Sequence, residues 1–356
     1  MKLSEELRRR GVPELRLSDD TLDHNAVWEN YRQELINILA SEEYGYAPPA
    51  PEKVWYSITA HNKFDYAGKA ETTSLTLKFD TDGGQFFFPV ELFIPNEREN
   101  PPVVVYLSHE SNYPNRYLPI EEIIDRGVAV AAFCYQHITN DTDDGFYSGL
   151  AAMYDRRKYS WGKIAMWAWA ASRVMDYLST QKCFNLQKAA VMGHSRLGKA
   201  ALWCGANDTR FSYVIANDAG CSGDAITREK TGEHVKDITT KFPYWFCQNY
   251  KKYAGNEENM PFDQHYLLAA IAPRRLYLGT SILDSWADPF SEYLAAYAAS
   301  SAYHYLGLDG LPADAADEPP VGNIFDEGYI AFHMRAGRHF LSREDWKLYL
   351  DYIEKT

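Results

Sequence analysis

The sequence predicts an α/β protein in which helices cover both faces of a mostly parallel central sheet. Short apolar segments alternate with helical stretches after residue 100, and such segments bounded by turn residues are typical of buried parallel strands. The segments are 102–108, 128–135, 189–193, 213–218 and 275–281. An antiparallel lead-in precedes them, because 72–80 and 85–95 read as strands joined by an Asp82-Gly83-Gly84 turn. Strands that alternate with helices predict a layered α/β sheet.

Three helices follow from spacing and capping residues. Residues 163–178 carry apolar side chains at helical spacing and form a crossover helix, and 28–39 is a charged helical stretch. Ser342, with Asp345 three residues later, predicts the N-cap of a terminal helix.

We expect a single domain over residues 1–356, with a helical and antiparallel extension over about the first 100 residues. The stretches 135–160 and 219–270 are longer than connectors need to be. We expect these two stretches to build a site over the sheet, and their many aromatic residues to line a sugar cleft.

The composition excludes several classes of function. The chain has 36 Lys+Arg against 49 Asp+Glu, a net charge of −13, which argues against nucleic-acid binding. No apolar stretch reaches the roughly 18 residues that span a bilayer, so no membrane partner is expected. No apolar segment follows the charged start, so we expect a cytoplasmic protein, or a secreted one if a signal peptide was trimmed before Met1.

The cysteines and histidines predict neither a disulfide framework nor a metal site. The five cysteines are widely spaced without a CxxC pair, and no HxxxH or HxH pairing occurs. We therefore expect no metal and no cofactor.

The most informative segment is the apolar strand that ends in Gly193-His194-Ser195 and runs directly into a helical stretch. A strand, a Gly-x-Ser and a helix form the layout of a nucleophile elbow, in which a tight turn exposes the serine at the helix N-terminus. The second glycine, Gly198, is displaced by one position from the usual Gly-x-Ser-x-Gly. An isolated Gly-x-Ser is also compatible with a simple helix cap, but the surrounding β-α series favours a catalytic serine.

A serine nucleophile in this layout requires an acid and then a histidine later in the chain. His339 follows a glycine turn just before the terminal helix, where a base-bearing loop belongs, whereas His333 lies in an apolar run and is expected to be structural. Two acids are placed to orient the base: Asp218 follows the strand after the elbow, and Asp284 follows the next apolar strand. The later strand favours Asp284, but the sequence leaves the choice open.

The oxyanion site lacks a familiar signature, because the loop at 109–112 has no Gly-rich element. We expect one donor from the backbone N–H of Arg196 and further donors from its guanidinium. Arg196 and Lys199 are expected to form a local positive pocket beside Ser195.

Several segments resemble the glucuronoyl esterases, specifically the bacterial branch of that carbohydrate esterase family. The resemblance spans roughly residue 103 to the C-terminus and rests on motifs in the same order at similar separations. They are GHSRLGKAALW (193–203), NDAGCSG (217–223), TGEHV (231–235), FPYWFC (242–247), PFDQHYLLAAIAPR (261–274), DSWADP (284–289) with Glu292, and GYIAFHMRAGRHFLSREDW (328–346).

The resemblance implies an α/β-hydrolase fold and cleavage of esters that join glucuronic acid, often 4-O-methylated, on xylan to lignin-like alcohols. It assigns Ser195 as nucleophile, His339 as base and Arg196 as the oxyanion arginine, and Asp218 and Asp284 both match positions where members carry an acid. Lys199 and Glu233 correspond to groups that bind sugar hydroxyls, and Trp286 to a tryptophan beside the uronate. Fungal members carry a disulfide cysteine where this chain has His194.

The predicted function is hydrolysis of glucuronate esters through an acyl-enzyme on Ser195, with a small-molecule or oligosaccharide uronate ester as substrate. An acetylxylan or acetyl-sugar esterase is an alternative, because the fold and the triad do not set the substrate. A carbohydrate-binding relative without catalysis is a further alternative.

Overall fold

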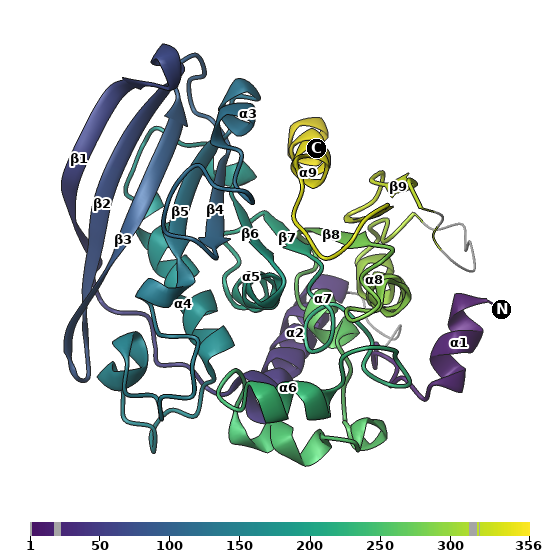
Figure 1. The fold of residues 1–356 in the computed structure, drawn as a ribbon. Helices are drawn as coiled ribbons and strands as arrows, with labels where there is room; N and C mark the ends of the chain where they lie inside the picture. Colours follow the sequence, from purple (N-terminus) through teal and green to yellow (C-terminus); the bar gives the residue numbers. More distant parts are fainter. Residues whose placement is uncertain (1, 18–22, 313–318, 320) are drawn as a thin grey trace.

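Figure 1 shows the computed structural model, which describes residues 2–17, 23–312, 319 and 321–356. In these ranges a sheet of ten strands has the order β1-β2-β3-β5-β4-β6-β7-β8-β10-β9. The strands from β5 to β10 in this order pair in parallel, as the apolar segments predicted. They are β4 (Val103–Ser108), β5 (Ala129–Cys134), β6 (Ala190–His194), β7 (Tyr213–Asn217), β8 (Arg275–Ser281) and β10 (Ile330–Arg335).

Antiparallel strands flank this parallel part on both sides. The predicted lead-in is present as β2 (Ala70–Thr81) and β3 (Gly84–Pro95), and β3 pairs antiparallel with β5. The edge strand β1 (Trp55–Asp65) was not predicted, because almost all of its side chains are exposed and no apolar alternation marks it. The short β9 (Ile324–Phe325) pairs antiparallel with β10 at the other edge.

Helices cover both faces of the sheet, as predicted (Figure 1). Along β4, Val103, Val105 and Leu107 enter the core beneath α4, α5 and α8, whereas Val104 and Tyr106 enter the core beneath α3 and α9. The helices are α1 (Leu3–Arg9), α2 (His24–Leu39), α3 (Ile120–Asp125), α4 (Lys163–Leu178), α5 (Arg196–Asn207), α6 (Val235–Lys241), α7 (His265–Ala269), α8 (Pro289–Tyr305) and α9 (Arg343–Lys355). No helix in the described ranges is long and apolar enough to cross a membrane.

The predicted helix boundaries agree with the structure, with one shift. Helix α4 spans the predicted residues, and Ser342 caps α9 in a reciprocal capping box with Asp345. Helix α2 begins at His24, four residues before the predicted start, because Asp23 accepts a hydrogen bond from the N–H of Ala26.

Short helical turns occupy much of the two long stretches and several connections. The π-helical turn η1 (Ala40–Tyr44) extends α2. The 3-10 turns are η2 (Tyr66–Gly68), η3 (Tyr135–His137), η4 (Gly149–Met153), η5 (Leu186–Lys188), η6 (Gln248–Tyr253) and η7 (Glu257–Asn259). Some aromatic residues of the long stretches belong to the hydrophobic core and do not line a cleft, since Tyr154 and Tyr159 are buried in it.

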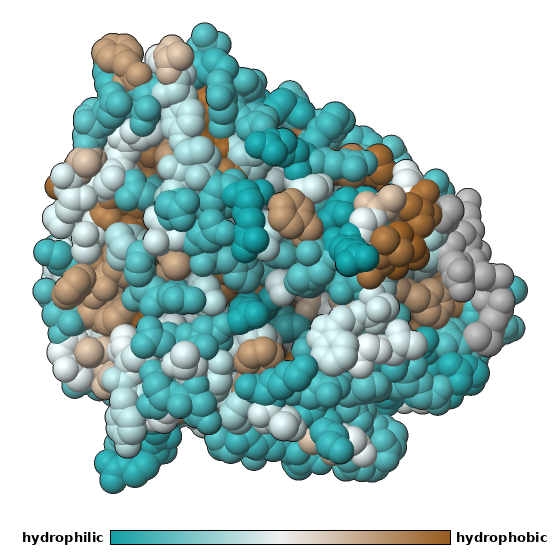
Figure 2. All heavy atoms as spheres, in the orientation of Figure 1, coloured by the Kyte–Doolittle hydropathy of each residue, from teal (hydrophilic) through white to brown (hydrophobic). Residues whose placement is uncertain are grey.

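The surface is largely polar. On the face in Figure 2, hydrophilic side chains predominate and hydrophobic ones occur in small groups. This distribution is ordinary for a folded domain with a large net negative charge.

Candidate active site

Ser195 lies in the tight turn between β6 and α5, where the sequence predicts it. Its backbone has φ 59° and ψ −128°, a conformation that is costly for any residue other than glycine. A Cβ on Gly193 would lie 2.0 Å from the carbonyl oxygen of Leu197, so only glycine fits before the serine. The displaced Gly198 has a different function, because it lets α5 approach Ala219, whose Cβ would lie 3.0 Å from an added Cβ.

His339 lies on the loop between β10 and α9, and this loop is held on both sides of the histidine. The Arg335 guanidinium donates hydrogen bonds to the carbonyl oxygens of Arg338 and Phe340 and forms a buried ion pair with Asp345. His333 also bonds Asp345, at 2.8 Å, so this histidine is structural, as predicted. These contacts fix the backbone that carries the His339 ring.

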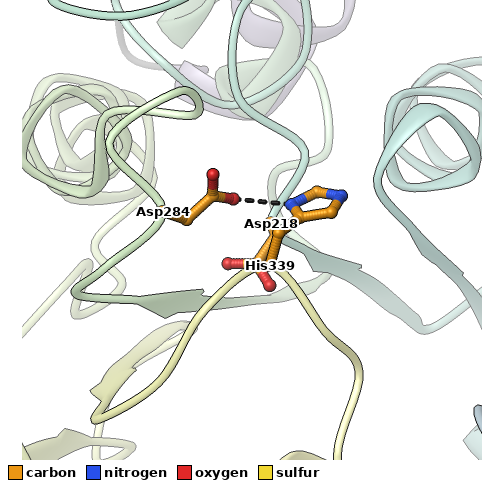
Figure 3. Close-up of side chains that lie close together, drawn as sticks. All are labelled: Asp218, Asp284 and His339. Carbon is orange, nitrogen blue, oxygen red and sulfur yellow. Dashed lines mark hydrogen bonds and ion pairs between the residues drawn. The ribbon is translucent and has the colours of Figure 1, made fainter.

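Ser195, His339 and Asp284 form a continuous hydrogen-bonded chain. The distance from His339 Nε2 to Ser195 Oγ is 2.9 Å, and that from His339 Nδ1 to Asp284 Oδ2 is 2.6 Å. Figure 3 shows the Asp284 carboxylate directed at the imidazole. Backbone hydrogen bonds from Ile282 to Arg335 and from Leu283 to Gly337 join the two loops that carry the acid and the histidine.

Asp218, the other candidate acid, lies close to His339 without a hydrogen bond to its ring. Its carboxylate accepts hydrogen bonds from Thr280 Oγ1 at 3.4 Å, Ser281 Oγ at 3.2 Å and the N–H of Phe340 at 3.4 Å. Burial raises the pKa of Asp218, the charge of His339 opposes the rise and that of Asp284 adds to it, and the resulting pKa is about 7.

Opposing effects set the charge of His339. Burial disfavours the imidazolium, but the hydrogen bond to Asp284 and the charges of Asp218 and Asp284 outweigh it, so the pKa of His339 is raised. His194, in the position before the serine, packs its ring against His339 with centroids 4.6 Å apart. Burial lowers the pKa of His194 well below its ordinary value, so the ring is neutral and its Nδ1–H donates to Asn217 Oδ1 at 2.7 Å.

The two carboxylates near His339, together with its ring, have the residue types that bind metal ions. Asp218, Asp284 and His339 each offer a ligand atom, and these atoms lie within 4.8 Å of one another. Both ring nitrogens of His339 already have partners, Ser195 and Asp284, so binding a metal there would break the hydrogen-bonded chain. The arrangement fits acid–base chemistry better than metal ligation.

Arg196 is the first residue of α5, so its backbone N–H has no partner inside the helix and is available beside Ser195. Its guanidinium forms an ion pair with Asp141 and lies over the ring of Trp245, with Cζ 4.9 Å from the ring centroid. The expected positive pocket is therefore partly neutralised, because Asp141 balances the charge of Arg196.

The structure places the three other predicted site residues in different surroundings. Lys199 is buried, and its ammonium donates to the carbonyl oxygens of Ala219 and Cys221. Trp286 is 46% exposed, and its carbonyl accepts the N–H of Glu233 at 2.9 Å. Glu233 and Trp286 thus lie side by side.

Asp141 is a neighbour of the site that was not predicted from the sequence. Asp141 lies in an irregular, polar part of the 135–160 stretch, and its partner Arg196 is 55 residues away. The length of this stretch was the one available signal that it approaches the site.

Comparisons with known proteins show the family to which the chain belongs. The family model described as "Glucuronyl esterase, fungi" matches residues 77–307, well over half of the chain. The chain belongs to the glucuronoyl esterase family. Its fold is accordingly that of an α/β-hydrolase, as expected.

Individual relatives support this membership. A carbohydrate esterase of an unknown prokaryotic organism is 41% identical over 66% of this chain and 55% of its own length, so the aligned part spans about half of that relative. A 4-O-methyl-glucuronoyl methylesterase of Schizophyllum commune is 29% identical over 79% of this chain and 69% of its own length. The solved glucuronoyl esterase of Solibacter usitatus is 30% identical, covers 96% of this chain and 97% of its own, and superposes with a TM-score of 0.86.

Proposed function

We propose that this protein is a serine esterase that hydrolyses esters of glucuronic acid, including 4-O-methyl-glucuronoyl esters. The observation that carries the proposal is the chain Ser195, His339 and Asp284, linked at 2.9 and 2.6 Å, in a member of the glucuronoyl esterase family. The names of two relatives, a glucuronoyl esterase and a 4-O-methyl-glucuronoyl methylesterase, indicate the acyl group.

In the first half of the reaction, Ser195 Oγ attacks the ester carbonyl while its proton moves to His339 Nε2. Asp284 accepts the Nδ1–H and stabilises the imidazolium that forms. The backbone N–H of Arg196, together with its guanidinium, stabilises the negative charge that develops on the carbonyl oxygen. The proton on Nε2 then passes to the alcohol oxygen, the ester C–O bond breaks, and a glucuronoyl ester of Ser195 remains.

In the second half, water replaces the alcohol. His339 takes a proton from the water as its oxygen attacks the acyl carbonyl, and the proton returns to Ser195 Oγ as the acyl bond breaks. The products are glucuronate and the free enzyme, so no cofactor is consumed.

The sugar is proposed to lie between the elbow and the paired residues Glu233 and Trp286. The half-exposed indole of Trp286 offers an apolar face to the pyranose ring, and the Glu233 carboxylate can accept hydrogen bonds from hydroxyls. Lys199 is assigned to the same subsite. Two of its three ammonium protons are directed at carbonyl oxygens, and the third remains for a sugar hydroxyl.

The test compares the wild type with Ser195→Ala on methyl and benzyl glucuronate, with product measured as released alcohol. We expect turnover by the wild type and a loss of about a million-fold in kcat in the variant, as for removal of a triad serine. Equal rates for the two proteins would refute the mechanism. Faster release of acetate from acetylxylan than of alcohol from either glucuronate ester would instead identify an acetyl esterase.

A further inference from the structure

The guanidinium of Arg196 has only one of its two terminal nitrogens engaged. Nη1 forms the ion pair with Asp141, whereas Nη2 has no hydrogen-bond partner among the residues that the structure describes. The side chain is 29% exposed, and Arg196 directly follows Ser195 in the chain. A ligand at the serine can therefore approach a guanidinium whose orientation is already fixed.

Asp141 fixes this orientation from the 135–160 stretch. Its side chain is only 6% exposed, and besides Arg196 its carboxylate accepts Trp245 Nε1–H at 2.7 Å and the Tyr135 hydroxyl at 3.1 Å. The guanidinium lies beside a stacked aromatic pair: its Cζ is 4.9 Å from the Trp245 centroid and 5.5 Å from the Phe242 centroid, and the two rings stack with centroids 3.9 Å apart. One carboxylate thus aligns both the arginine and the indole on which it rests.

A buried lysine in turn fixes the backbone on both sides of Asp141. Lys163, at the start of α4, has a side chain with 0% exposure. Its ammonium donates to the carbonyl oxygens of Asn140 at 2.7 Å and Thr142 at 2.8 Å and to Asp144 at 2.7 Å. The backbone N–H of Lys163 also donates to the carbonyl of Tyr244. This bond holds the segment that contains Trp245 at the N-terminus of α4.

We propose that Asp141, held by Lys163, is the positioning residue that keeps the Arg196 guanidinium ready for the anionic tetrahedral intermediate. This inference rests on the proposed ester hydrolysis. Asp141 touches neither the serine nor the base, and acts only through Arg196. A donor that is already oriented stabilises the intermediate with no free-energy cost of reorientation during the reaction. An arginine without its bond to Asp141 would sample other rotamers.

The test is Asp141→Asn, with Asp143→Asn as the matched control, since Asp143 is exposed on the same loop. We expect Asp141→Asn to lower kcat by about 10- to 100-fold with KM nearly unchanged, because misplacing a catalytic group has costs of this order. In an Arg196→Ala background the same substitution should change kcat by less than about 2-fold, since the two residues act as one unit. Asp143→Asn should match the wild type.

Inhibition by phenylboronic acid separates this inference from the choice of substrate. Boron forms a negatively charged tetrahedral adduct with the serine oxygen, so its inhibition constant, measured against p-nitrophenyl acetate, reports stabilisation of the anion. We expect Asp141→Asn to weaken inhibition by about 10-fold or more, even if glucuronate esters prove not to be substrates. Unchanged inhibition and unchanged kcat, or an equal loss of kcat in both backgrounds, would overturn the inference.

If Asp141→Asn does not fold, Trp245→Phe provides the test. This substitution removes one hydrogen bond to Asp141 and keeps an aromatic face under Arg196. A loss of about 3-fold or more in kcat and in boronate affinity supports the inference, because the lost hydrogen bond to the charged Asp141 acts on the reaction only through the position of Arg196, and no loss in either overturns it.

Discussion

At the scale of single residues, the structure assigns different surroundings to the two acids near His339. Asp284 accepts the Nδ1–H of the imidazole, whereas Asp218 contributes its charge from a position bonded to Thr280 and Ser281. Only the first contact can hold the ring in the tautomer that leaves Nε2 free to accept a proton. The acid that follows the later strand therefore fits the triad.

We predict that Asp284→Asn and Asp218→Asn have unequal effects. Asp284→Asn should lower kcat by about 10³- to 10⁴-fold, as expected when the histidine tautomer is lost. Asp218→Asn should lower kcat by less than about 10-fold, because no bond to the ring is removed.

The pH profile distinguishes the two roles further. The charge of Asp218 raises the pKa of His339, so removing this charge lowers that pKa. The base must be neutral, and activity is lost as the pH falls through its pKa, so the acidic limb of kcat/KM should move to lower pH in Asp218→Asn. Similar losses of kcat in both variants, with an unmoved acidic limb, would indicate that the acids are interchangeable.

At the scale of elements, the strand–turn–helix of β6 and α5 depends on two glycines for different reasons. The lack of a side chain at Gly193 leaves room for the Leu197 carbonyl in the elbow, and its lack at Gly198 leaves room for α5 to contact Ala219. A Cβ at Gly193 would lie 2.0 Å from a backbone oxygen that cannot move away without opening the turn. A Cβ at Gly198 would lie 3.0 Å from Ala219 Cβ and 3.3 Å from the Gly193 carbonyl oxygen, and a shift of a few tenths of an ångström relieves contacts of this length.

We therefore predict that Gly193→Ala destabilises the protein by about 3 kcal/mol or more and abolishes esterase activity. Gly198→Ala should cost about 1 kcal/mol or less, because part of the clash is offset by the higher helix propensity of alanine. Urea unfolding at constant pH and the reactivity of Ser195 toward a fluorophosphonate measure the two effects. Equal destabilisation by the two substitutions would contradict this account of the elbow.

At the scale of the whole molecule, buried carboxyl groups retain protons in the folded state to unusually high pH. Burial raises the pKa of Glu43 to about 8, and the charge of Asp263 also raises it, although a hydrogen bond from Gln264 opposes the shift. Gln264 Nε2 lies 3.1 Å from Glu43 Oε2, while Gln264 Oε1 is buried without a hydrogen-bond partner. A protonated Glu43 would supply that donor and complete an acid–amide pair.

The sign of the pH effect follows from the protons bound in each state. The unfolded chain releases the Glu43 proton near pH 4.5, and the folded chain retains it to about pH 8. The folded state thus binds more protons in this window, so this group removes about 1.4 kcal/mol of stability for each pH unit that the pH rises.

Glu43→Gln should therefore match the wild type in unfolding free energy near pH 4.5 and exceed it increasingly toward pH 8. Urea denaturation at several pH values measures the difference between the two proteins. Glu52→Gln, at an exposed position, serves as the control and should leave the pH dependence unchanged. A constant difference between Glu43→Gln and the wild type across this range would mean that Glu43 is ionised throughout.

The sequence by itself determined the layered fold, the parallel strands and the elbow, because hydrophobic periodicity and the glycine before Ser195 are local features. It also indicated His339 as the candidate base and reduced the candidate acids to two. The edge strand β1 was not predicted, because its exposed side chains lack the alternation of apolar and polar residues that burial of one face imposes.

Only the tertiary structure decided which acid bonds His339 and which residue holds Arg196. Both depend on hydrogen-bonded contacts between segments that are distant in the chain, Asp284 with His339 and Asp141 with Arg196. The conformation of such loops is fixed by groups like Lys163 and Arg335, whose partners include backbone carbonyls, which carry no signal in the amino-acid sequence.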